Sequence, residues 1–180
     1  MVGKSNYSII VRQKGYSVDD LRFWEIVQLA HDQSDDDMGK KCEVIRTVIS
    51  KLPRDDAVAF SRIFDSTMDR AYSWPLWGAA YVIHGGCGDD TFSDFRASLI
   101  SRGRNAFEKA LADPDSLADE AFDEDSWFYE GYQYAVTDGV EAAVGSMVSR
   151  EKPLAQEPSG TEWAEDKVNS LYPKLSGKFA

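Results

Sequence analysis

Apolar residues recur every three to four positions through most of this chain, and strand-like alternation is nearly absent. Because an α-helix turns once in 3.6 residues, this spacing places apolar side chains on one face of each predicted helix. The clearest stripes are Phe23, Ile26, Val27, Ala30 and His31; Met38, Cys42, Ile45, Val48, Ile49 and Leu52; and Ala57, Phe60, Phe64, Met68 and Ala71. The sequence therefore predicts an all-α fold, a single compact domain of six or seven helices.

Capping residues and helix breakers separate these stripes. Ser17 followed by Asp20 resembles a capping box at the first helix, and "SDDD" (residues 34–37) suits the start of the second. Pro53 separates the second helix from the third, and Ser73 is expected to cap a fourth helix over about 74–84.

The fourth predicted helix contains "LWGAAYVI", which is apolar on nearly all sides, so it is expected to be central and buried. Gly85 and Gly86 are expected to end it. Asp89 or Asp90 is expected to cap a fifth helix, which Gly103 is expected to kink.

The remainder is expected to contain a turn at 113–116, a helix over about 126–136 and a linker at 151–160. A last short helix over "EWAEDKVNSLY" (residues 162–172) is expected to pack Trp163, Val168 and Leu171 against the body. The predicted organisation is therefore a helical domain over 1–150, followed by a linker and C-terminal helix over 151–180.

No segment reaches the roughly 20 apolar residues that a membrane-spanning helix needs, and the first residues lack the apolar core of a signal peptide. The two cysteines are 45 positions apart, and Cys42 lies on an apolar stripe, as expected of an inert core residue. Reduced thiols and a cytoplasmic location are therefore expected. No cofactor is predicted.

Acidic residues are concentrated in one segment. The net charge is −11, and residues 110–149 hold ten acidic side chains and no basic one. Such a segment repels nucleic acid and attracts a basic protein partner. It is also consistent with a solvated face that only keeps the protein in solution.

The heptad "HGGCGDD" (residues 84–90) combines His84, Cys87, Asp89 and Asp90 with three glycines. A turn between two helices is the favoured interpretation, because glycine ends helices and aspartate begins them. The alternatives are a small-ligand or anion site, a zinc site, or a catalytic thiol whose pKa is lowered by a helix N-terminus. The zinc alternative is weak because paired ligands such as Cys-x-x-Cys are absent.

A second group of polar residues falls on the third helix. Asp65, Asp69 and Tyr72 lie at i, i+4 and i+7, away from the apolar stripe, and Arg70 and Arg96 are candidate partners for the two acids. An ion-pair network that clamps the third and fifth helices is favoured. The alternative is a carboxylate pair that binds a divalent metal or acts as a general base.

Aromatic residues crowd the same region, among them Trp77 and Tyr81. Such residues more often form a core than a platform for stacking a sugar or a base. They complete the set of candidate ligand- or partner-site residues.

These residues resemble a known bacterial family, domain of unknown function 4240 (DUF4240). The likeness is strongest over "FDSTMDRAYSWPLWGAAYVIHGGCGDDTFSDFRASLISRGR" (residues 64–104), with further likeness at 22–27, 110–119 and in the tail. His84 stands where the family pattern has asparagine, and Ser98 where it has tryptophan, which implies a small void or an altered groove. The resemblance implies no activity, because the family is named for its lack of one.

Two functional hypotheses follow. The first is a non-catalytic binding or regulatory module whose acidic face at 110–149 meets a basic partner, as an inhibitor or immunity-type protein does. The second is an enzyme or a protein that binds a small ligand or metal through the "HGGCGDD" loop with Asp65, Asp69 and Arg96. The first is favoured because no complete catalytic constellation is visible in the sequence.

Overall fold

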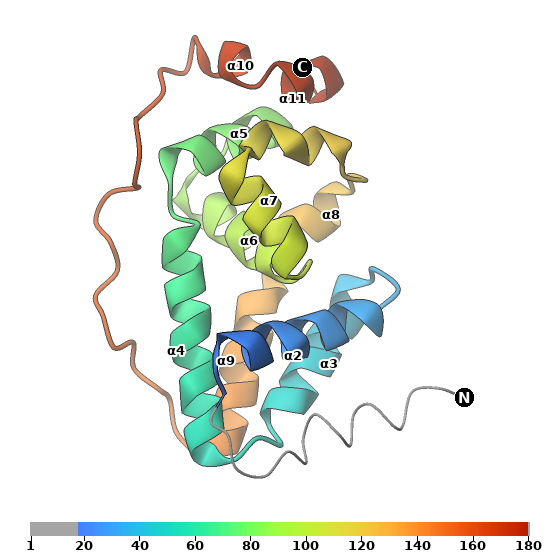
Figure 1. Ribbon diagram of the computed structural model, residues 1–180, viewed down its shortest axis with the longest axis vertical. Helices are drawn as coiled ribbons and strands as arrows, with labels where there is room; N and C mark the ends of the chain where they lie inside the picture. The colour runs from blue at the N-terminus through green and yellow to red at the C-terminus, as the bar shows by residue number, and fades with distance from the viewer. Residues whose placement is uncertain (1–17, 180) are drawn as a thin grey trace. The chain divides into compact units, whose positions relative to one another are not determined.

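The computed structural model describes residues 18–179, and these residues form an all-α protein (Figure 1). Within that range there are ten α-helices, one 3₁₀ helix, and no β-structure beyond an isolated bridge between Ser73 and Ser159. The predicted fold class is confirmed. The chain is grouped into two compact units, a first unit of residues 18–66 and 131–152 and a second unit of residues 67–130 and 153–179.

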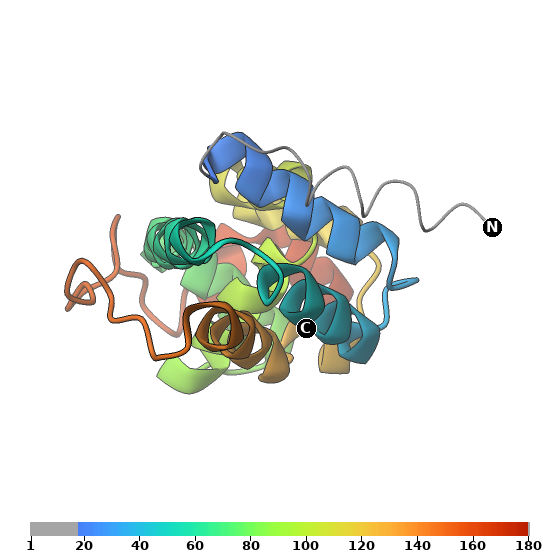
Figure 2. The same cartoon turned by 90° about the horizontal axis from the view of Figure 1, so that it is seen from below.

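The first unit is built from α2 (Asp20–Asp32), α3 (Met38–Ile49), most of α4 (Arg54–Arg70) and α9 (Gly131–Val144). Within it, α3 lies along both α2 and α9 (Figures 1 and 2). Residues 67–70, the last turn of α4, belong to the second unit.

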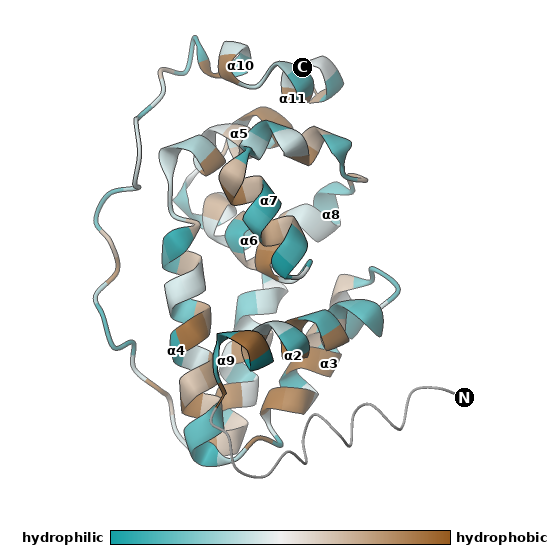
Figure 3. Cartoon of the chain, in the orientation of Figure 1, coloured by the Kyte–Doolittle hydropathy of each residue, from teal (hydrophilic) through white to brown (hydrophobic). Residues whose placement is uncertain are grey.

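The predicted apolar stripes form the core of the first unit. Apart from His31, which is half-buried, their members on α2 and α3 are buried, with Ile26, Ile45 and Val48 wholly inaccessible to solvent. Figure 3 shows apolar residues recurring along these helices between hydrophilic ones. Helix α9 approaches α3 closely at Gly139, where an added Cβ would lie 2.9 Å from the Cβ of Ile49.

The start of α2 differs from the prediction. Asp19 is the N-cap residue, and its carboxylate accepts a hydrogen bond from the backbone N–H of Arg22 (2.9 Å). Ser17, the predicted cap, lies outside the described residues. Aspartate is as good a cap as serine, so the sequence alone does not separate two candidates that are two positions apart. Helix α3 begins as predicted, with Asp37 as its cap.

The second unit contains α5 (Trp74–His84), α6 (Asp89–Ile100), α7 (Arg104–Ala112), η1 (Pro114–Asp119), α8 (Glu124–Trp127), α10 (Val168–Leu171) and α11 (Pro173–Phe179). Helix α5 contacts α6, η1, α10 and α11, and α6 contacts α7 and α8. The Ser73 hydroxyl caps α5 by accepting from the N–H of Leu76, and Gly85 ends it with φ of 70°. Both ends of α5 were predicted from the sequence.

Several predicted boundaries in this unit are wrong. Gly88 occupies the N-cap position of α6, while Asp89 and Asp90 lie in its first turn, where their charges favour the helix dipole but do not cap. Gly103 does not kink a helix. With φ of 94° it separates α6 from α7, because a left-handed residue interrupts helical hydrogen bonding.

The later helices also differ from their predicted bounds. The helix expected over 126–136 is two helices, α8 and α9. The helix expected over 162–172 begins later, at Val168, and ends at Leu171; α11 follows after a break at Tyr172. Leu171, predicted to be buried, is 55% exposed, whereas Val168 is buried. No described helix combines the length and the apolar character that crossing a membrane requires.

Gly139→Ala is expected to lower the free energy of unfolding by about 1–3 kcal/mol, because the new methyl group overpacks the contact with Ile49 and Arg46. Urea denaturation followed by circular dichroism measures the change. Gly177→Ala is the control, because it lies in a helix with open space around it and gains helix propensity worth up to about 1 kcal/mol. Equal effects at the two positions would contradict the proposed close packing.

Candidate functional site

The "HGGCGDD" loop is fastened to the start of α5 by an indole group. Trp77 Nε1 donates a hydrogen bond to the carbonyl oxygen of Cys87 (2.8 Å), across the loop that joins α5 to α6. Gly85 and Gly86 both have positive φ, 70° and 132°, which only glycine adopts readily. The contacts of the loop backbone are thus those of a tight helix–helix connection.

His84 is exposed at the end of α5 and contacts the segment around α8. Its Nδ1 lies 2.7 Å from the carbonyl oxygen of Gly86, and its Nε2 lies 3.6 Å from Glu124 Oε1. Its ring also packs against that of Phe128, with centroids 4.6 Å apart. The histidine therefore links the loop to α8.

Cys87 does not have the chemistry of an activated nucleophile. The pKa of the half-exposed thiol is raised to about 12, chiefly by burial; the hydrogen bond with Trp77 lowers it, and the charges of Asp89 and Asp94 raise it. The possibility of a thiol with a lowered pKa is therefore contradicted. A protonated thiol is a weak nucleophile and a weak metal ligand at neutral pH.

The acids of the loop point to solvent rather than to a shared ligand. Asp89 and Asp90 are exposed in the first turn of α6. Among residues 18–179, no three or more His, Cys, Asp or Glu side chains gather in an arrangement that could hold a metal ion. The metal-site alternative gains no support from this loop.

Arg96 acts as a clamp within the second unit. Its Nη1 donates to the carbonyl oxygen of Met68 at the end of α4 (3.0 Å), and its Nε to that of Phe92 (3.4 Å). The guanidinium carbon lies 4.8 Å from the ring centre of Tyr72 and 5.1 Å from that of Phe92. These contacts tie the last turn of α4 to α6 through backbone carbonyls and aromatic rings, while the ion-pair network with Asp65 and Asp69 stays a prediction.

The other charged candidates also have partners nearby. Arg70 forms a bidentate pair with Glu108, at 3.0 and 2.8 Å, and its guanidinium lies over the ring of Phe107. Asp69 is half-buried in the last turn of α4. Asp65 belongs to the first unit, where its Oδ1 accepts a hydrogen bond from Arg150 Nη1 (3.4 Å). Arg150 was not among the partners considered from the sequence.

The aromatic candidates stack on one another. Trp77 lies nearly parallel to both Trp74 and Phe92, at centroid distances of 5.5 and 4.8 Å, and Tyr72 packs beside it at 6.1 Å. Tyr81 packs against Trp163 at 5.0 Å, and its hydroxyl donates to Glu165. These aromatic side chains therefore pack on one another, although Tyr72, Trp77 and Tyr81 are half-buried rather than part of the buried core.

Ser98, which replaces a tryptophan of the family pattern, is wholly buried. Its hydroxyl accepts a hydrogen bond from the backbone N–H of Tyr129 (3.1 Å), and its carbonyl oxygen accepts one from Ser101. The smaller residue thus has a hydrogen-bonding role of its own between α6 and the segment after α8.

Asp94 is a functional candidate that the sequence reasoning missed. Partial burial raises its pKa to about 6, and the nearby charges of Glu130 and Asp90 contribute to the rise. Its position four residues after Asp90, one turn along α6, was the signal available in the sequence. Tyr172 was also missed as a partner of α5, and Trp163, which was expected to pack against the body, donates to the carbonyl oxygen of Trp74 in α5.

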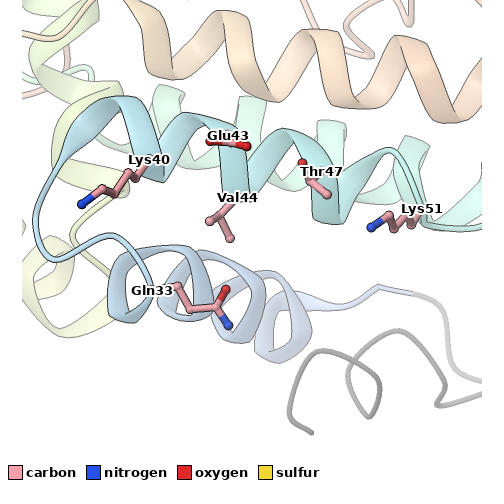
Figure 4. Close-up of a pocket in the computed structure, with 6 residues that line it drawn as sticks. All are labelled: Gln33, Lys40, Glu43, Val44, Thr47 and Lys51. Carbon is pink, nitrogen blue, oxygen red and sulfur yellow. The ribbon is translucent and has the colours of Figure 1, made fainter. Parts of the chain in front are cut away.

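A shallow hollow of about 370 Å³ lies in the first unit, away from all the predicted site residues. It is lined by Gln33 of the α2 end and by residues of α3 and its end, with Lys40 and Lys51 at opposite ends (Figure 4). Glu43, Val44 and Thr47 lie between them. The mixture of charges and the open shape give it no clear preference for a ligand.

The fold and contacts describe an all-α protein whose polar motif side chains join helix ends in the second unit. The family model described as "Protein of unknown function (DUF4240)" matches residues 18–141, and the chain belongs to that family. No curated protein matches the chain, and neither does any solved structure.

The Cys87 thiol is expected to react with iodoacetamide at pH 7.5 at least about tenfold more slowly than the same cysteine in unfolded protein, because its raised pKa leaves little thiolate. Mass spectrometry of tryptic peptides separates its alkylation from that of Cys42. Protein in concentrated urea is the control. A folded-state rate equal to or above the unfolded rate would show an activated thiol.

Asp94→Asn is expected to stabilise the protein at pH 7.5 and to do so less at pH 4. The raised pKa of Asp94 means that its favourable contribution is present below about pH 4 and is lost as the pH rises through about 6. Urea denaturation at both pH values measures this. In an Asp90→Asn background the gain at pH 7.5 should shrink, and a pH-independent gain would contradict the assignment.

Proposed function

We propose that this protein is a non-catalytic binding module of the bacterial cytoplasm, whose acidic surface on the second unit binds a basic protein partner. An inhibitor or an immunity-type protein that masks a basic effector is one form of such a module. The location is supported by the cysteines, both of which are free thiols.

The exposed acids of the second unit are the observation that carries the proposal. Of the ten acidic residues in 110–149, eight lie in the second unit, while Asp138 and Glu141 lie in the first. We call the second-unit set the acidic surface; it comprises Asp113, Asp115, Asp119, Glu120, Asp123, Glu124, Asp125 and Glu130. The proposed binding surface therefore includes eight of the ten acidic residues of the 110–149 segment.

Some of these acids have structural roles and others are available to a partner. Asp123 caps α8, and Asp119 and Glu120 lie 3.3 and 3.8 Å from Lys109 Nζ. Asp113 and Asp125 are exposed. Exposed charges of one sign attract a basic partner over roughly 10 Å at 0.1 M salt and more weakly at higher salt.

The catalytic alternative is less well supported by the same contacts. The thiol of Cys87 has a raised pKa, and Arg96 contacts backbone carbonyls and aromatic rings. No combination of nucleophile and base emerges from these contacts.

The double variant Asp113→Lys and Asp125→Lys is expected to weaken partner binding on the order of tenfold or more in low salt, because it replaces attraction by repulsion. A basic protein captured from lysate is identified, purified and measured by calorimetry at about 0.05 and 0.5 M salt. Glu25→Lys with Glu43→Lys, which makes the same charge change on exposed positions of the first unit, is the control. Equal losses in both double variants, or binding that is insensitive to salt, would contradict the proposal.

A further inference from the structure

The C-terminal segment of the second unit consists of two short helices, α10 and α11, which are separated by a break at Tyr172. We call residues 167–179 the basic tail, because they contain three lysines and no acidic residue. Val168, Tyr172 and Leu175 are 1%, 6% and 0% exposed, whereas the three lysines are exposed. The basic tail is therefore an amphipathic segment, whose three buried anchors come from two helices and the residue between them.

Part of the acidic surface holds the basic tail. The carboxylate of Asp115 accepts hydrogen bonds from the backbone N–H groups of Lys174 (3.1 Å) and Leu175 (3.0 Å), at the start of α11. Lys178 Nζ donates to the carbonyl oxygens of Ala118 (2.9 Å) and Glu120 (2.6 Å). A carboxylate at the helix start and carbonyls beneath its last lysine suit the polarity of a basic helix.

Helix α5 provides the other part of the surface on which the basic tail packs. The hydroxyl of Tyr172 donates to the carbonyl oxygen of Pro75 (2.6 Å), and the ring lies against Gly78. A Cβ at Gly78 would come within 2.6 Å of the Tyr172 hydroxyl oxygen, so the absence of a side chain there makes room for the ring. We call the surface of α5 and η1 that these anchors occupy the tail groove.

The basic tail follows a segment that is held at the start of α5, where Ser159 hydrogen-bonds the backbone of Tyr72 and Trp74 and Trp163 donates to the carbonyl oxygen of Trp74; an extended connection precedes this segment. Residues 151–157 are all exposed and non-helical. The tail lies beyond residues 18–141, the part of the chain that the family model matches. A tethered segment of this kind reaches its groove at an effective concentration in the millimolar range, and it is displaced only by a ligand that competes with that concentration.

We propose that the basic tail is an internal competitor for the tail groove, and that the partner binds by inserting a basic segment with apolar anchors in its place. The inference rests on the proposed function, since it names the element that the acidic surface recognises. The charge of the tail matches what that surface attracts, and its apolar anchors supply the contacts that charge alone does not. By occupying the tail groove, the basic tail lowers the affinity of the protein for partners that lack matching apolar anchors.

The test uses the full chain and a fluorescent synthetic peptide of residues 167–179. Leu175→Asp places a carboxylate at a wholly buried anchor beside Asp115, so it is expected to release the tail. Fluorescence anisotropy should then show the peptide binding this variant at least about tenfold more tightly than it binds the wild-type chain. A peptide carrying the same Leu175→Asp change should bind neither. Equal affinities of the wild-type peptide for the two chains would overturn the proposal.

A second variant separates release of the tail from loss of the fold. Gly78→Ala removes the room for Tyr172 while favouring helix at α5. It is expected to expose the tail to trypsin at Lys174 and Lys178, as Leu175→Asp does. It should not gain affinity for the peptide, because the groove itself is altered. Circular dichroism establishes that both variants stay helical, and protection of the tail in both variants would count against an exchangeable tail.

A chain that is cut between the body and the tail tests the proposal even if the Leu175→Asp variant fails to fold. A protease site introduced into the exposed residues 154–157 is cut after folding, so that the tail is held without a covalent link. An excess of a longer peptide, residues 158–179, should displace the fragment, and the same peptide carrying Leu175→Asp should not; the longer peptide is needed because Ser159 and Trp163 also hold the fragment. A fragment that leaves only when the protein unfolds would overturn the proposal.

Failure of the inference and failure of the proposed function give different results. If a basic partner binds the wild-type chain and Leu175→Asp with equal affinity, the acidic surface binds its partner outside the tail groove. The peptide can exchange as expected while charge reversal on the acidic surface leaves the affinity for the partner unchanged. In that case the exchangeable tail is confirmed and the proposed function is wrong.

Discussion

The second unit depends on a helix that has too little polar surface to face water. Helix α5 buries Leu76, Ala79, Ala80, Val82 and Ile83, so neighbouring segments have to cover it on several sides. Helix α6, η1 and the two C-terminal helices all contact it. Its small residues let these segments come close, most clearly where Tyr172 lies against Gly78. The placement of the motif residues and of the tail follows from covering this one helix.

The polar residues that look most like a catalytic set act between helix ends. Trp77 holds the backbone of Cys87, His84 reaches α8, and Arg96 holds the end of α4. Each of these residues makes a hydrogen bond or a ring contact at a helix end. The contacts are needed because a helix terminus leaves backbone groups unpaired and because neighbouring helices meet there at an angle. Specific residues at these positions are therefore explained by packing and hydrogen bonding without any substrate.

The acidic surface and the basic tail are best understood together. An acidic segment could be a solvated face and nothing more, but here the Asp115 carboxylate accepts from backbone N–H groups of the basic tail, and backbone carbonyls near η1 accept from Lys178. The surface thus holds two short helices whose lysines are exposed and whose three anchors are buried. That specificity supports a binding module more than a surface whose role is solubility.

The sequence by itself determined the all-α class, the buried stripes of α2 to α4, both ends of α5 and the family. These depend on local spacing and on capping groups that act within a few residues. It did not separate Asp19 from Ser17 as a cap or show that Gly103 ends a helix, since the sequence offers acceptable alternatives at both places. Only the tertiary structure decided that Asp65 pairs with Arg150, that the pKa of Cys87 is raised, and that Tyr172 occupies the space beside Gly78. Those outcomes depend on burial and on contacts between residues far apart in the chain, and the spacing of residues along the sequence carries no record of them.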